Sequence, residues 1–121
     1  MRSRHALVPV LAAGLALAAA APALAHTELV STTPTSGGAV ARMPKTLVMT
    51  FTEPPLKVLR VTVLRGTTAA SGVTGRLNPK NAKQILVPMK AGRAGKYRVS
   101  TQLIAPDGDK QLVTYGFRVT G

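Results

Sequence analysis

The chain has 121 residues, and its 16 Lys and Arg against four Asp and Glu give a formal net charge of +12. It contains two histidines and no cysteine. This composition excludes a disulfide framework, a cysteine-based zinc cluster and a cysteine nucleophile.

Residues 1–25 have the three parts of a secretory signal peptide. Residues 1–4 are short and basic, residues 6–20 are rich in Ala and Leu, and Ala23-x-Ala25 is a small-residue cleavage pattern. The alternative is an N-terminal membrane anchor, but the apolar stretch is short and contains Pro9. We therefore predict cleavage after Ala25. The mature protein would be a single domain, His26–Gly121, in the periplasm or another extracytoplasmic space.

The mature region predicts an all-β domain. Apolar residues alternate with polar ones in the period of two that is typical of half-buried strands. Strands are expected over 28–31, 47–52, 58–64, 85–88, 96–105 and 113–120, with residues 65–83 as a long loop carrying one short strand around Val73. Residues 106–109, Pro-Asp-Gly-Asp, predict a tight turn. Short strands separated by Pro and Gly turns indicate an antiparallel sandwich or barrel.

The charge of the mature region allows several partners. Without Arg2 and Arg4, 14 basic residues stand against four acids, but they are spread along the sequence with no dense cluster. The chain has two Tyr, two Phe and no Trp, too few aromatics to stack on bases, so nucleic acid is not expected. Anionic lipid or cell-wall polymer is a partner that such charge would suit. A solvated basic surface is the alternative.

The mature region offers few groups for catalysis. His26 would be its only histidine, which excludes HExxH and multi-histidine zinc sites. Asp107 and Asp109 could form a carboxylate pair, but in this turn their side chains are equally suited to bonding nearby backbone amides. At a new amino terminus, His26 would offer its α-amine and ring Nδ1 to one metal. Nitrogen and carboxylate donors favour Cu(II).

Short motifs in a fixed order extend this argument. They are His26-x-x-Leu29-Val30-Ser31-x-x-Pro34-x-x-Gly37, Leu47-x-Met49-x-Phe51-Thr52-Glu53-Pro54, Gly95-x-Tyr97-x-Val99, Asp107-Gly108 and Gly116-Phe117-x-Val119. The set spans the mature region and resembles the CopC family of exported copper-binding proteins. The resemblance implies an immunoglobulin-like or cupredoxin-like Greek-key β-sandwich or barrel. It also implies Cu(II) held by the N-terminal histidine and by an Asp-Gly-His turn, with a nearby glutamate in some members.

Carried onto this sequence, the resemblance assigns His26 and Asp107 as metal ligands and Glu53 as the nearby glutamate. The turn departs from the family pattern, because Asp109 stands where the second histidine is usual. Either Asp109 supplies an oxygen in place of the lost nitrogen, which would weaken Cu(II) binding, or the site is lost and the fold serves another purpose. The methionine-rich segment of some members is also missing.

The sequence thus predicts a monomeric exported protein, not an enzyme, that holds or ferries Cu(II) in copper homeostasis or resistance. A membrane copper-transport protein would be its partner. The main alternative is a basic interaction module without a metal site. A second alternative is an oxidative copper enzyme with a histidine brace, but such a brace needs a second histidine that the mature region lacks.

Overall fold

The computed structural model describes residues 26–121, which form nine strands. The predicted signal peptide, 1–25, lies outside the described residues. The strands are β1 (Leu29–Thr33), β2 (Ala39–Val40), β3 (Thr46–Phe51), β4 (Lys57–Arg65), β5 (Thr68–Ala69), β6 (Arg76–Asn78), β7 (Asn81–Pro88), β8 (Gly95–Ile104) and β9 (Lys110–Val119). Within residues 26–121, no helix has the length and apolar character needed to cross a membrane.

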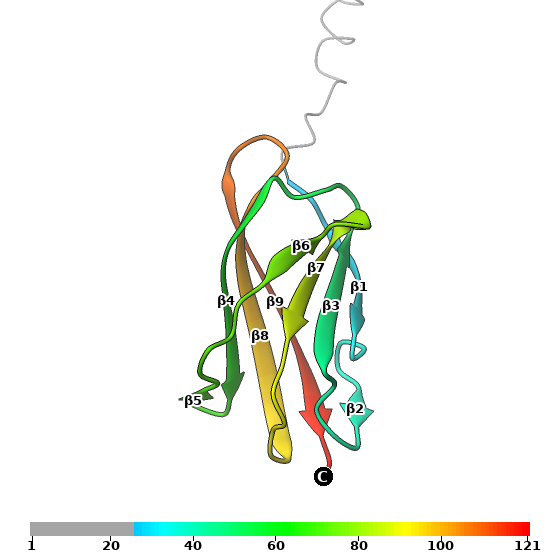
Figure 1. Ribbon diagram of the computed structural model, residues 1–121, viewed down its shortest axis with the longest axis vertical. Helices are drawn as coiled ribbons and strands as arrows, with labels where there is room; N and C mark the ends of the chain where they lie inside the picture. The colour runs from blue at the N-terminus through cyan, green and yellow to red at the C-terminus, as the bar shows by residue number, and fades with distance from the viewer. Residues whose placement is uncertain (1–25) are drawn as a thin grey trace, which may run out of the picture.

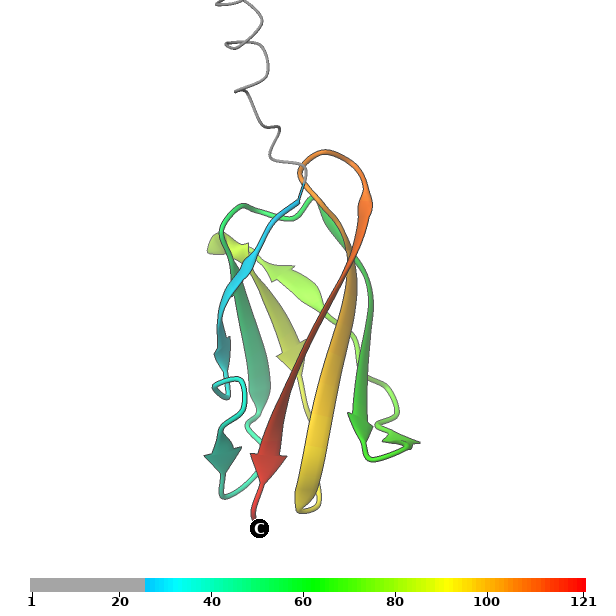
Figure 2. The same cartoon turned by 180° about the vertical axis from the view of Figure 1, so that it is seen from behind.

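The strands form two sheets packed face to face (Figure 1). One sheet has the order β1-β3-β7-β6, and the other has the order β2-β9-β8-β4-β5. Turning the molecule by half a turn brings β9 and β8 to the front (Figure 2). The pairs are antiparallel except β2 with β9, which is parallel. The predicted all-β sandwich is confirmed.

The segment between β4 and β7 differs from its prediction. The short strand expected around Val73 is wrong, because the strands here are β5, β6 and the first part of β7. Gly66, with φ of 61°, lets the chain reverse directly after β4 so that Leu64 and Arg65 pair with β5. Val73 instead packs against the core from a loop. Two-residue strands such as β5 and β2 are too short to show any period in sequence.

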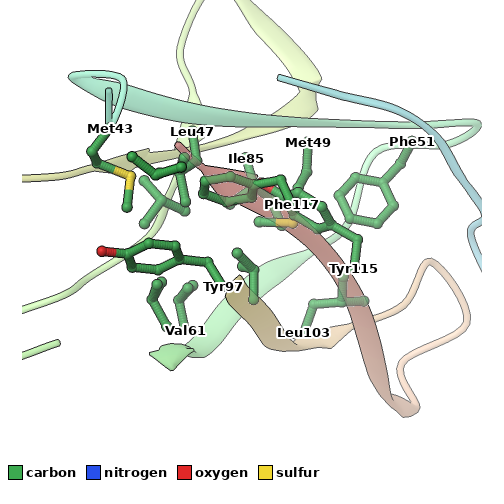
Figure 3. Close-up of a cluster of buried hydrophobic side chains, with 14 of the residues drawn as sticks. Met43, Leu47, Met49, Phe51, Val61, Ile85, Tyr97, Leu103, Tyr115 and Phe117 are labelled. Atoms are coloured by element: carbon green, nitrogen blue, oxygen red, sulfur yellow. The ribbon is translucent and has the colours of Figure 1, made fainter. Parts of the chain in front are cut away.

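The core lies between the sheets and consists of the alternating residues that the sequence pattern predicts. Leu47, Met49 and Phe51 of β3 are almost fully buried (Figure 3). Opposite them, Tyr97 and Phe117 stack with ring centroids 5.5 Å apart and planes 9° from parallel. Each large side chain buried in this way stabilises the fold by about 1.5–3 kcal/mol.

Among the described residues, the buried apolar residues of this core fall between Met43 and Val119. Residues 26–121 contain this core and both sheets. The hydroxyl of Thr101, a fully buried residue, donates a hydrogen bond to Sδ of Met49 over 3.4 Å. That contact satisfies the Thr101 donor within the apolar interior.

The topology gathers three distant segments at one end of the sandwich. Leu29 of β1 pairs with Phe51 at the end of β3, and Ile104 pairs with Lys110 across the β8–β9 turn. The start of the described chain, the β3–β4 loop and the β8–β9 turn consequently lie together at the top in both views (Figures 1 and 2). Every residue predicted to bind a metal belongs to this end.

Candidate metal centre

Thr27 fixes the start of the described residues to the end of β3. It is fully buried, although it precedes the first strand. Its hydroxyl donates a hydrogen bond to the carbonyl oxygen of Glu53 (2.7 Å) and accepts one from the Glu53 N–H (2.9 Å). One side chain therefore satisfies both backbone groups of Glu53, which the end of the strand would leave without a ladder partner.

Gln111 fixes the same residue to β9. Its side-chain Nε2 donates to the carbonyl oxygen of Thr27 (2.6 Å), and its Oε1 accepts from the Thr27 N–H (3.1 Å). The amide of Gln111 thus pairs with the Thr27 backbone as a neighbouring strand would. Through Thr27, the amino-terminal segment is joined to both sheets.

His26 is held by its neighbour and is itself exposed. Because Thr27 is bonded to Glu53 and to Gln111, the backbone of His26 is one residue away from both attachments. Its side chain is open to solvent and to an incoming ion.

The β8–β9 turn is built by local hydrogen bonds. Oδ1 of Asp107 accepts a bond from the Asp109 N–H (3.1 Å), and the Asp109 carbonyl oxygen accepts one from Ala105 (2.8 Å). Gly108 lies between them with φ of 92°, a conformation that favours glycine. Asp107 therefore has the turn-forming role that its sequence context allowed. Both aspartates are exposed.

Glu53 follows β3 on the same end of the sandwich. Its backbone is bonded to Thr27, and its carboxylate is exposed. Glu28 lies beside it, because the Glu28 carbonyl oxygen accepts from the Thr52 N–H (2.8 Å). All four carboxylate side chains of this basic chain, Glu28, Glu53, Asp107 and Asp109, thus occur on the segments that meet at this end.

The predicted ligands do not form a close cluster in the structure. Within residues 26–121, no three His, Cys, Asp or Glu side chains lie together closely enough to hold a metal ion. The assignment of His26, Asp107, Asp109 and Glu53 therefore remains a prediction. The structure gives each of these four residues a fixed backbone position and an exposed side chain at the same end of the sandwich.

The donor types at this end are compatible with a Cu(II) ion. An imidazole together with carboxylates is a nitrogen and oxygen set, which tetragonal Cu(II) accepts. Thiolates are absent from the whole sequence, so a Cys-based Cu(I) or zinc site is not an option. An α-amine at His26 would add a second nitrogen if the chain begins there.

Sequence reasoning missed Thr27 and Gln111, the two residues that organise this end. The sequence pattern gave no indication that Thr27 is buried, because a single polar residue next to the predicted cleavage point belongs to no periodic pattern. The inward position of Gln111 could have been predicted, since Gln111 lies on the same face of β9 as Val113, Tyr115 and Phe117. A polar amide at an inward position indicates a buried hydrogen-bonding partner.

Comparison with known proteins supports the relationship that the motifs suggested. The model of the CopC domain matches residues 29–120. CopC from Methylosinus trichosporium OB3b has a similar structure, with 22% identity over 78% of this chain and 94% of that one and a TM-score of 0.65. PcoC, a methionine-rich copper resistance protein from Escherichia coli, is 22% identical over 79% of this chain and 100% of that one, with a TM-score of 0.64.

No curated protein matches this chain by sequence. The structural likenesses establish the two-sheet β-sandwich, and the family match extends over nearly all of the described residues. The chain belongs to the CopC domain family.

Proposed function

We propose that this protein is an exported copper-binding protein that holds or ferries Cu(II) in copper homeostasis. The ion would be bound through His26 at the mature amino terminus and through the carboxylates of the β8–β9 turn. No redox turnover is involved. The protein would act as a monomer outside the cytoplasm and pass its ion to a membrane transport partner.

The observation that carries this proposal is the double attachment of Thr27. A ligand at a chain terminus is normally poorly positioned, since terminal residues tend to be disordered unless they are tied down. Here the buried Thr27 is bonded to Glu53 and to Gln111, and these bonds limit the freedom of the residue just before it. A terminal histidine at this place would be pre-organised for chelation.

The position of Asp109 shapes the expected strength of the site. Its carboxylate would give Cu(II) an oxygen where an imidazole would give a nitrogen, so the affinity should be lower and the selectivity over other divalent ions poorer. Asp107 and Glu53 are the further oxygen donors on the neighbouring segments. The binding of a metal to an amine and an imidazole releases protons, so affinity should fall as the pH is lowered.

The test is a Cu(II) titration of protein purified from the exported fraction, with its amino-terminal mass determined. Electron paramagnetic resonance of the product reports the ligand atoms. A one-to-one complex with tetragonal nitrogen and oxygen coordination supports the proposal. The absence of binding in protein shown to begin at His26 would contradict it.

A further inference from the structure

The outer face of the five-stranded sheet gathers basic residues that are scattered in the sequence. In β4, β8 and β9 the inward positions hold the core, so the alternate positions point outward. We call these outward positions the cationic face. Its basic members, all exposed, are Lys57, Arg60, Lys96, Arg98, Lys110 and Arg118.

The strand register places like charges side by side on this face. Lys96 of β8 is directly opposite Arg118 of β9, and Lys57 and Lys110 flank Ile104 in a single row. Like charges directly opposite one another across strands destabilise a sheet. Folding therefore gains nothing from this arrangement, and a partner of opposite charge would relieve the repulsion.

Acidic residues do not occur at the outward positions of these strands. All four acids of the chain belong to the segments next to β1, β3 and the β8–β9 turn. The middle row of the face is instead made of small hydroxyl residues, Thr62, Ser100 and Thr114. The charged side chains of this face are consequently all positive, whereas the carboxylates lie at the end of the sandwich where His26 is found.

The face also has a hollow suited to an anionic group. A trough of about 710 Å³ runs over Gly116 and is lined by Lys96 and Arg98 among others. Gly116 places no side chain in this space, and a Cβ there would lie 3.0 Å from the carbonyl oxygen of Tyr97. The ammonium of Lys96 and the guanidinium of Arg98 at the rim can donate hydrogen bonds to phosphate oxygens. Leu112, 62% exposed, adds an apolar contact on the same face.

We propose that the cationic face binds the surface of a membrane that contains anionic phospholipids. Six basic residues is within the four to eight that such recognition commonly uses. They lie near both ends of the ten-residue strands, and the eight residue steps from Lys110 to Arg118 span about 27 Å, which suits a planar partner better than a thread-like polymer. Nucleic acid is disfavoured, because all four aromatic side chains of the chain are buried and cannot stack on bases.

The experiment compares the binding of residues 26–121 to vesicles of phosphatidylcholine alone and to vesicles with about 30% phosphatidylglycerol. The test variant is K96Q/R98Q/R118Q. The control is R76Q/K80Q/K83Q, which removes the same charge from exposed positions of β6, β7 and their hairpin in the other sheet. Thermal unfolding of each variant verifies the fold, and the single variants replace the triple if it unfolds.

Because one cation near an anionic surface changes affinity about fivefold, the test variant should bind about 100-fold more weakly to the anionic vesicles. The control should stay within about fivefold of the parent, and about half-molar NaCl should release the parent protein. Equal losses in both triple variants would overturn the proposal, since the binding would then depend on net charge alone. Binding to soluble polyphosphate but not to the vesicles would also overturn it, in favour of a polymer.

Discussion

The backbone of Thr27 and the side-chain amide of Gln111 form two hydrogen bonds in opposite directions, of 2.6 and 3.1 Å. The two residues are 84 positions apart, and the contact joins the start of the described residues to the start of β9. Since the hydroxyl of Thr27 is also bonded to Glu53, this residue connects the two sheets at one end.

Replacement of Thr27 by Val should destabilise the protein by about 1–3 kcal/mol. Valine has the shape of threonine but leaves the N–H and carbonyl of Glu53 without their buried partner. Chemical denaturation measures the change. Thr114→Val, at an exposed position of β9, is the matched control and should remain within about 0.5 kcal/mol. Equal effects of the two substitutions would show that the hydrogen bonds between the Thr27 hydroxyl and Glu53 do not stabilise the fold.

The strands of the core could be predicted from the sequence because burial imposes a strict period of two. The positions of Tyr97, Val99 and Leu103 in β8 follow this period, and all are buried. Periodicity gives no information where strands are two or three residues long, as in β2, β5 and β6. Those strands depend on turns and on partners far along the chain, such as the pairing of Val40 with Val119.

The hydroxyl of Tyr115 is a buried group without a hydrogen-bond partner among residues 26–121. Replacement by Phe removes that hydroxyl and keeps the ring that stacks on Phe117 with centroids 6.2 Å apart. The free energy of unfolding should be unchanged or higher by up to about 1 kcal/mol, because an unsatisfied polar group is lost. A loss of more than about 1 kcal/mol would show that the hydroxyl is satisfied by bound water.

Tyr115 should also weaken the fold at alkaline pH. Burial raises the pKa of its hydroxyl well above its usual value of about 10. In the unfolded chain the hydroxyl loses its proton near pH 10, whereas the folded protein retains it, so the unfolded state binds fewer protons above that pH. Stability is therefore full below about pH 10 and decreases as the pH rises further. Denaturation curves of Tyr115→Phe should show a shallower decrease over this range than those of the parent.

Replacement of His26 by Ala should abolish tight Cu(II) binding and leave the metal-free protein as stable as before. The side chain is exposed, so its removal changes no packing. A second variant with one Ala added before His26 keeps the imidazole but removes the α-amine from the chelate. It should bind at least about tenfold more weakly. Isothermal titration with Cu(II) distinguishes the three proteins, and parental affinity in His26→Ala would refute the assignment.

Motif order assigned His26, Glu53 and Asp107 as candidate ligands through the resemblance to the family, and this assignment stays a prediction. It could not show that Asp107 accepts a hydrogen bond from the Asp109 N–H, which depends on the folded turn. It also could not show the cationic face, since the basic residues of that face come together only when β4, β8 and β9 are paired.

Replacement of Asp109 by His should strengthen Cu(II) binding by about tenfold or more. The substitution supplies a second imidazole at an exposed position of the turn, and nitrogen is the preferred donor for this ion. Electron paramagnetic resonance should show an additional nitrogen in the coordination sphere. Asp109→Asn is the control, because it removes the carboxylate and adds no strong donor. A decrease of affinity in Asp109→Asn would identify the native carboxylate as a ligand. Identical affinities of the His and Asn variants would show that this position of the turn does not face the ion.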